Sequence, residues 1–248
     1  MDELRDLLPN IPRPIGTSPQ KSEPNNKPPN CPICLDTGWI RPNRDLNPSD
    51  PQFGKLNRCP CRIRDDAIRL QDRLGSPLDP NIRPADLLDR GVDSRRMIAA
   101  VSKFIADPMG FLTLWGANGT GKSTALAGIA NHFIDEGTRA LYITATDAAS
   151  YIKAGIEQDF NPDDRVAWLS EIPILCLDEI TQAYMGNWVS DHFGSIIDRR
   201  SKTRVGTVLA MDQDPLKKLP RRVVSRMQTG PMIQIDEADM RPLLGGNQ

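Results

Sequence analysis

Residues 116–123 read GANGTGKS, which matches the phosphate-binding pattern G-x-x-x-x-G-K-[ST] without a gap. The apolar run FLTLW (111–115) precedes this octet, and the helical pattern STALAGIANHFIDEG (123–137) follows it. A strand, a loop and a helix in this order let backbone N–H groups converge on phosphate oxygens, and the helix N-terminus adds its positive dipole end. A chance match in a surface loop is the alternative, and these flanks weigh against it. We therefore expect the loop to bind a nucleoside triphosphate.

The residue types within the octet fit separate tasks. Gly116, Gly119 and Gly121 allow the backbone to bend around the phosphates. We expect Lys122 to reach the outer phosphates and Ser123 to help hold Mg²⁺. The expected ATP-binding residues are Gly116, Ala117, Asn118, Gly119, Thr120, Gly121, Lys122, Ser123 and Thr124.

A second apolar run, IPILCLD (172–178), ends in the acidic pair Asp178-Glu179. Ligands gather at the carboxyl ends of strands in open parallel sheets, where Asp178 would join Ser123 in a Mg²⁺ site. We expect Asp178 to hold Mg²⁺ through its water shell and Glu179 to orient and polarise the attacking water. Together with Lys122 they are candidate catalytic residues. Because a small-molecule kinase has no use for a water-activating carboxylate, the pair favours ATP hydrolysis.

From about residue 91 the sequence alternates strand and helix patterns, as a parallel α/β sheet requires. Apolar residues at helical spacing predict that the helix after the octet and a helix at 187–200 each bury one face in the core. The expected strands are FLTLW (111–115), RALYIT (139–144), IPILCLD (172–178), VGTVLAM (205–211) and PMIQID (231–236).

Four of the five cysteines lie in two close pairs, CPIC (31–34) and CPC (59–61). We expect Cys31, Cys34, Cys59 and Cys61 to be the ligands of a structural Zn²⁺. The segment has too few large apolar residues to form a core, so the metal would supply its folding free energy. Disulfides and redox chemistry are the alternatives; a cytosolic setting argues against the first, and the Cys-Pro-Cys pair is unexplained by the second. The fifth, Cys176, is expected to be buried.

The chain has 248 residues, room for one good-sized domain and a smaller one. We expect a flexible Pro-rich tail at 1–30, a zinc-binding module with a linker helix at 31–74, and an ATPase domain at 75–248. No apolar run approaches the roughly 20 residues of a membrane span, and the N-terminus lacks a signal-peptide layout, so we expect a cytoplasmic protein without a membrane partner. The net charge of −1 gives no global argument for nucleic-acid binding.

Two basic stretches remain to be interpreted. In the first, PLKKLPRRVVSRMQ (215–228), and at Arg241, the arginines form either a solvated basic surface or a contact to the γ-phosphate, in this subunit or from a neighbour. Sequence alone leaves these alternatives open. We expect the second stretch, RRSKTR (199–204), to be exposed.

Taken together, these motifs resemble the bacterial replicative-helicase loaders of the DnaC/DnaI type within the AAA+ ATPases. The similarity spans about residues 30 to 242, and the segments that carry it are CPICLDTGW, the octet, LCLDEI, the helix from Trp188 to IIDRR, and SRM…DMR. Insertion-sequence ATPases of the IstB type share the core, but typically without the cysteine module. They bind duplex DNA and recruit a transposase, which is the alternative function.

The resemblance implies an AAA+ core with strand order 5-1-4-3-2 and little or no helical lid. It implies that Arg226 is an arginine finger reaching a neighbour's ATP and that Arg241 is the sensor-2 arginine. The zinc module would grip the hexameric replicative helicase, while the core self-associates into an AAA+ oligomer and touches single-stranded DNA. ATP would act as a switch that stabilises one assembly, which hydrolysis releases.

One position departs from the family pattern. After the fourth strand the family usually has an asparagine that senses the γ-phosphate, and here the aligned residue is Asp212. A carboxylate would repel the phosphate unless it is protonated or faces Mg²⁺. We therefore expect slow hydrolysis, or a register in which Gln213 takes the role. A non-hydrolysing adaptor, whose loop only fixes structure, remains a third possibility.

Overall fold

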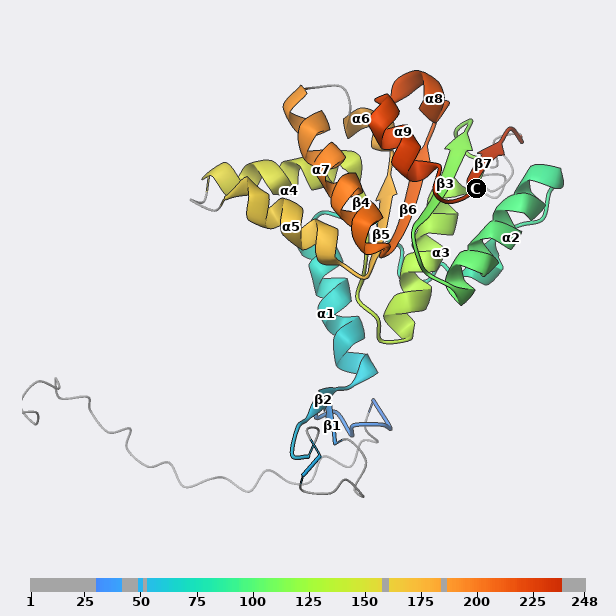
Figure 1. Ribbon diagram of the computed structural model, residues 1–248. Helices are drawn as coiled ribbons and strands as arrows, with labels where there is room; N and C mark the ends of the chain where they lie inside the picture. Colours follow the sequence, from blue (N-terminus) through green and yellow to red (C-terminus); the bar gives the residue numbers. More distant parts are fainter. Residues whose placement is uncertain (1–29, 42–48, 51–52, 158–160, 184–186, 238–248) are drawn as a thin grey trace, which may run out of the picture.

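The computed structural model describes residues 30–41, 49–50, 53–157, 161–183 and 187–237. Almost all of the tail expected at 1–30 therefore lies outside the described residues. A short antiparallel hairpin, β1 (Trp39–Ile40) and β2 (Asn57–Arg58), leads into the helix α1 (Pro60–Arg73). Helix α1 connects this small N-terminal part to a larger α/β part (Figure 1).

The α/β part is built on a five-stranded sheet among the described residues. Its strands are β3 (Phe111–Gly116), β4 (Ala140–Thr144), β5 (Ile174–Asp178), β6 (Gly206–Met211) and β7 (Met232–Ile235). The order β4-β5-β6-β3-β7 with every pair parallel is the order 5-1-4-3-2 read from the other edge, so that prediction is confirmed. β5 and β6 are buried along their whole length, as expected for strands covered on both faces.

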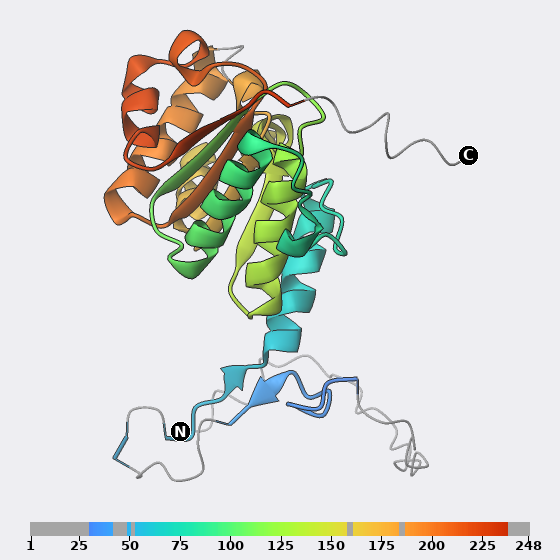
Figure 2. The same ribbon diagram turned by 90° about the vertical axis from the view of Figure 1, so that its right-hand side faces the viewer.

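Helices cover both faces of the sheet (Figures 1 and 2). One face packs against α2 (Val92–Ala106) and α3 (Lys122–Asp135), after the short 3₁₀ turn η1 (Pro84–Asp86). The opposite face packs against α4 (Ala145–Glu157), α5 (Pro162–Glu171), α6 (Ile180–Ala183), α7 (Asn187–Thr203) and α9 (Arg221–Met227), with α8 (Pro215–Lys218) before α9. Most of the predicted core residues are buried: Leu126, Ile129, Ala130 and Phe133 on α3, and Phe193, Ile196 and Ile197 on α7. Val189, predicted for the same face of α7, is partly buried against the core.

Local sequence accounts for where several helices begin. Asn161 accepts a hydrogen bond from the Asp163 N–H at 3.0 Å, just before Pro162 begins α5. Asp214 caps α8 in the same way, accepting from the Leu216 N–H at 3.0 Å. Both are side-chain caps followed by a proline whose missing N–H costs the first turn nothing.

The basic stretch 199–204 is not wholly exposed, which corrects the expectation from sequence. Arg200 is 0% exposed, although its neighbour Arg199 faces solvent. Its guanidinium donates to the hydroxyl of Thr207 and to four carbonyl oxygens, those of Leu169, Ser170, Ile172 and Gly206. These carbonyls belong to the end of α5 and the start of β6, so Arg200 fastens the helix layer to the sheet. Burial lowers the pKa of Arg200 to about 9, which leaves it charged at neutral pH.

Candidate nucleotide-binding site and cysteine cluster

The octet forms the turn between β3 and α3, at the carboxyl end of the central strand. Gly116, at the end of β3, has φ of 135°, and a Cβ there would lie 2.1 Å from the Ile235 carbonyl oxygen of β7. Only glycine permits this approach of two backbones. Gly121 precedes α3 in the left-handed region, with φ of 93°. The loop therefore has the strand–loop–helix context that the sequence predicted.

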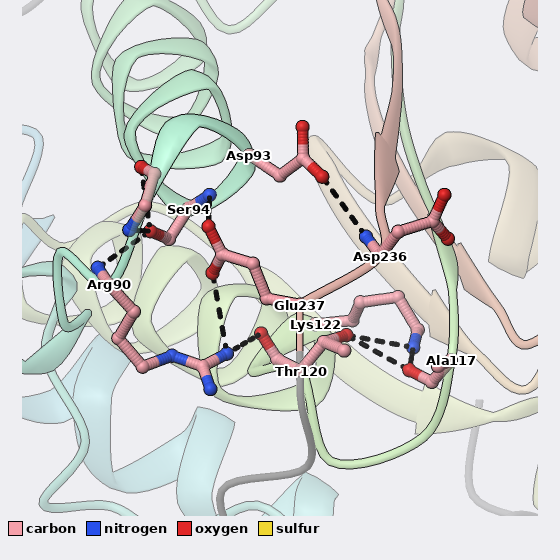
Figure 3. Close-up of polar contacts among 9 residues, drawn as sticks. Arg90, Asp93, Ser94, Ala117, Thr120, Lys122, Asp236 and Glu237 are labelled. Atoms are coloured by element: carbon pink, nitrogen blue, oxygen red, sulfur yellow. Dashed lines mark hydrogen bonds and ion pairs between the residues drawn. The ribbon is translucent and has the colours of Figure 1, made fainter.

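The Lys122 ammonium lies inside the loop, and the residue is only 7% exposed. Nζ donates to the carbonyl oxygen of Gly116 at 2.8 Å. It also donates to the Ala117 carbonyl oxygen at 2.6 Å and to the Thr120 hydroxyl at 3.3 Å (Figure 3). The side chain thus places a positive charge within a ring of backbone groups at the N-terminus of α3. That charge and the helix dipole together favour an anion at this point.

The acidic pair lies at the same edge of the sheet. Asp178 ends β5 and is 5% exposed, while Glu179 directly after it is exposed. The Glu179 N–H donates to Asp178 Oδ1 at 2.8 Å, and Glu179 itself has φ of 53°, in the left-handed region. A buried carboxylate followed by an exposed one gives two different environments: one suits a fixed metal ligand, the other a group in contact with water.

Tyr142 of β4 lies beside Asp178. Its hydroxyl donates to Asp178 Oδ2 at 2.7 Å. Burial and the Asp178 charge raise the pKa of Tyr142 well above its ordinary value. Ser123, directly after Lys122, and Asp178, at the end of β5, lie at the same edge of the sheet. Hydroxyl and carboxylate oxygens are ligands that Mg²⁺ prefers, so the residues present fit that ion.

Asp212 follows β6 at the same edge, because Met211 pairs with Trp115 directly before Gly116. Its carboxylate accepts from the Thr181 hydroxyl at 2.9 Å and from the Gln213 amide at 3.3 Å. Partial burial raises the pKa of Asp212, but these hydrogen bonds and the Lys122 charge lower it by more, so the net shift is downward. Asp212 is thus ionised at neutral pH, close enough to Lys122 to feel its charge.

The four cysteines of the N-terminal part form a compact cluster. Their Sγ atoms all lie within 4.8 Å of one another, with Cys31–Cys59 at 3.7 Å and Cys34–Cys61 at 3.4 Å. Zn–S bonds of about 2.3 Å in a tetrahedron separate neighbouring sulfur atoms by about 3.8 Å, whereas a disulfide requires about 2.05 Å. The geometry therefore fits a four-thiolate zinc site, and the four cysteines are free thiols rather than disulfide-bonded.

The surroundings of the cluster are consistent with a metal centre. The Gly38 N–H donates to Cys34 Sγ at 3.3 Å. Burial raises the pKa of Cys34, but this hydrogen bond and the other cysteine side chains lower it by more, to about 7, whereas the Cys34 thiol and burial raise the pKa of Cys61. Large apolar side chains nearby, including Ile33, Leu35 and Phe53, are more than half exposed. Among the described residues the cysteines themselves are the buried core of this part, as expected when a metal stabilises it.

No model of a protein family matches the sequence, and no curated protein matches it either. The structure is similar to AMPPCP-bound DnaA from Aquifex aeolicus, with a TM-score of 0.59 and 21% identity over 64% of this chain and 51% of that one. It is also similar to a crystal structure of the DnaC helicase loader (TM-score 0.57, 17% identity, 63% of this chain, 97% of that one) and to one of DnaI (0.54, 21%, 65%, 92%).

The chain has the AAA+ fold. At these identities the similarity establishes the fold and leaves the activity to be argued from the site. The chain spans about half of the length of the DnaA structure it matches, against almost all of the DnaC structure.

Arg226 lies away from the loop within this AAA+ fold. It is on α9, whose apolar residues pack on the sheet face opposite α3. Its Nε atom lies 3.0 Å from Asp198 Oδ1 on α7, and its side chain is 44% exposed. An arginine in this position faces solvent on the single chain, where a second subunit can approach it. Arg241 lies outside the described residues.

A polar network that the sequence did not predict borders the loop (Figure 3). Arg90, just before α2, donates to the Thr120 carbonyl at 3.4 Å and pairs with Glu237 at 3.6 Å. Glu237 also accepts from the Ser94 N–H at the start of α2 at 3.0 Å. These contacts tie the phosphate-binding loop and α2 to the chain just after β7. Arg90 and Glu237 are 147 positions apart, and no local pattern in the sequence indicates the pairing.

Tyr142 is a further residue of the site that sequence reasoning missed. It stands in the expected strand RALYIT (139–144). A signal was available, because a buried tyrosine hydroxyl usually finds a hydrogen-bond partner. The sequence alone does not say that this partner is Asp178.

Among the described residues, no helix combines the length and apolar character that crossing a bilayer requires.

Proposed function

We propose that this chain is an ATP-dependent loader of a hexameric replicative DNA helicase onto single-stranded DNA during replication initiation. The observation that carries the proposal is the combination of two parts in one chain. The first is a phosphate-binding loop with an acidic pair at the same sheet edge, and the second is a four-cysteine cluster that α1 joins to it. The transposition ATPases typically lack such a cluster. The DnaC and DnaI structures are also covered almost completely by the match.

In this proposal each site residue has a task. The loop from Gly116 to Thr124 binds the phosphates of ATP, and Lys122 turns from its carbonyl partners toward them. Ser123 and Asp178 hold Mg²⁺, which supplies charge neutralisation on the phosphates when bound. Glu179 orients and polarises the attacking water.

The remaining residues act on hydrolysis or assembly. Arg226 of one subunit is the arginine finger that contacts the ATP of its neighbour. Arg241 is the sensor-2 arginine and acts on the ATP of its own subunit. Ionised Asp212 near the γ-phosphate slows hydrolysis, and the partner helicase stimulates it. ATP binding stabilises one assembly and hydrolysis releases it, because an effector that binds one state better shifts the population toward that state.

The cysteine cluster binds Zn²⁺ through Cys31, Cys34, Cys59 and Cys61 and docks on the helicase. Contact of the core with single-stranded DNA is proposed by analogy with a DnaA structure described as bound to AMPPCP and single-stranded DNA, to which this chain is similar with a TM-score of 0.60.

The test is native mass analysis of this protein with the replicative helicase of its host, with and without ATP. We expect a discrete complex of helicase hexamer plus several copies of this chain, lost in the Cys59→Ser/Cys61→Ser double variant. Cys176→Ala, which removes a buried cysteine outside the cluster, is the matched control and should retain the complex. No complex, together with ATP-dependent filaments on duplex DNA, would instead support the transposition class.

A further inference from the structure

Tyr142 and Asp178 form a buried side-chain hydrogen bond between neighbouring strands. The hydroxyl lies 2.7 Å from Asp178 Oδ2, and both residues are 5% exposed. Strands β4 and β5 pair in parallel, with Thr144 opposite Asp178. Tyr142 lies two residues before Thr144, so its side chain is on the same face of the sheet as that of Asp178. That face carries α3 and the phosphate-binding loop. The phenol thus reaches the carboxylate from within the core.

Both oxygens of Asp178 are held by protein donors. Oδ2 accepts from Tyr142, and Oδ1 accepts from the Glu179 N–H at 2.8 Å. A carboxylate has about four acceptor positions, so about two remain for waters of a metal ion. Two donors on different oxygens fix the plane of the carboxylate. Because the phenol is neutral, it fixes that plane without cancelling the negative charge, as a lysine or arginine would.

The backbone of Tyr142 is itself held from outside the sheet. β4 is an edge strand, and α1 with the turn after it covers that edge. With its amide oriented to satisfy the hydrogen bonds, Gln71 donates to the Tyr142 carbonyl at 2.7 Å and accepts from the Tyr142 N–H at 3.2 Å. The Ser76 hydroxyl also donates to that carbonyl. The side chains of Gln71 and Ser76 therefore bind the backbone groups of Tyr142 that a further strand would otherwise pair with. These hydrogen bonds fix the backbone position from which the phenol extends.

We propose that Tyr142 is a positioning residue for the Mg²⁺-nucleotide site: its hydroxyl orients the Asp178 carboxylate toward the water shell of the ion. This rests on the proposed nucleotide-binding function. Hydrogen bonds that orient a metal-binding side chain typically contribute 10- to 100-fold to metal affinity. Tyr142 touches neither substrate nor metal in this proposal and acts through the Asp178 carboxylate, which accepts the hydrogen bond from its hydroxyl.

The test compares binding of AMPPCP to the full chain in EDTA and across a range of Mg²⁺ concentrations, by titration calorimetry. For Tyr142→Phe we expect unchanged AMPPCP affinity in EDTA. Mg²⁺ raises the AMPPCP affinity, and we expect the variant to need about a tenfold higher Mg²⁺ concentration to reach half of that increase. Tyr151→Phe makes the same chemical change on α4, away from Asp178, and should match the wild type. Asp178→Asn should lose the gain, and adding Tyr142→Phe to it should have no further effect, since the two residues act as one unit.

Two results would overturn the inference alone. One is a Mg²⁺ dependence of AMPPCP binding in Tyr142→Phe equal to that of the wild type. The other is a loss of AMPPCP affinity in Tyr142→Phe that is as large in EDTA as in Mg²⁺, which would indicate a packing role. A wild-type chain that binds no AMPPCP in either condition would overturn the proposed function as well, so the two failures are distinguishable.

Discussion

The Nζ atom of Lys122 lies 2.6 Å from the carbonyl oxygen of Ala117, five positions earlier in the same loop. The lysine that is proposed to meet the nucleotide phosphates thus stabilises its own loop in the chain described here. Phosphate oxygens compete with these carbonyls for the ammonium, and a charged acceptor forms the stronger hydrogen bond. The loop carbonyls of Gly116 and Ala117 therefore enclose the Lys122 ammonium at the N-terminus of α3.

Lys122→Ala removes both that cation and its loop contacts. We expect nucleotide binding to be abolished, measured as AMPPCP titration in the presence of Mg²⁺. Lys153→Ala removes an exposed lysine on α4 and should leave affinity unchanged. Undiminished affinity in Lys122→Ala would refute the assignment of the loop.

Glu179→Gln separates binding from hydrolysis. The side chain is exposed and follows Asp178 at the sheet edge, so the fold does not depend on it. We expect retained ATP binding, an ATP-bound assembly that persists, and phosphate release reduced about 100-fold or more, the usual contribution of a positioned general base. Glu171→Gln, at the end of α5, is the control. Normal turnover in Glu179→Gln would exclude its role.

Local patterns predicted the parts of the fold that local sequence determines. The octet, the buried strands and the apolar helix stripes each depend on residues within one element, and all are present. The strand order was implied by the resemblance rather than by any such pattern. The helices α4 and α5 were not predicted individually, although Asn161 and Pro162 at the start of α5 are a local signal of a helix N-terminus.

What sequence could not predict depends on contacts between distant segments. Arg200 was expected to be exposed because it stands among charged residues, but the carbonyls at the end of α5 enclose it. Tyr142 meets Asp178 only because β4 and β5 are neighbours, and Arg90 meets Glu237 only because β7 lies next to β3. In each case the side chain's partner is set by the topology and not by the adjacent sequence.

Arg226→Ala tests the arginine finger. Arg226 and Arg222 lie on the same helix and each pairs with an aspartate of α7, Asp198 or Asp191, at 3.0 and 3.3 Å. Both pairs are exposed, so losing either costs little stability. We expect Arg226→Ala to bind ATP normally but to lose most of its hydrolysis in the assembly, while Arg222→Ala retains it. Equal activity of the two variants would contradict the assignment.

Mixing adds a direct check on the neighbour's role. Arg226→Ala supplies an intact ATP site, and Lys122→Ala supplies an intact finger. If the arginine acts on the neighbour's ATP, mixtures of these two inactive variants should recover part of the hydrolysis rate. No recovery in such mixtures would argue against action between subunits.

Removal of zinc should affect the N-terminal part and spare the ATPase part. In Cys59→Ser/Cys61→Ser we expect the bound zinc measured by atomic emission to fall from about one per chain to none, since two of four ligands are lost. AMPPCP affinity should remain, because the loop belongs to the separate core around β3 and α3. Loss of zinc and nucleotide binding together would mean that the two parts fold as one.

Arg200→Met should destabilise the α/β part strongly. Arg200 is fully buried and donates to the Thr207 hydroxyl and to carbonyls of α5, the turn after it and β6, so methionine would leave those acceptors without a donor inside the core. Each unsatisfied buried acceptor costs about 1–3 kcal/mol, although relaxation and water entry reduce the sum, and we expect a loss of about 3 kcal/mol. For a chain of this size that corresponds to a Tm lower by about 6–12 °C. Arg199→Met changes the exposed neighbouring arginine and should shift Tm by no more than about 2 °C. Thermal melts followed by circular dichroism measure both, and equal Tm values would show that the buried guanidinium contributes nothing to holding α5 on the sheet.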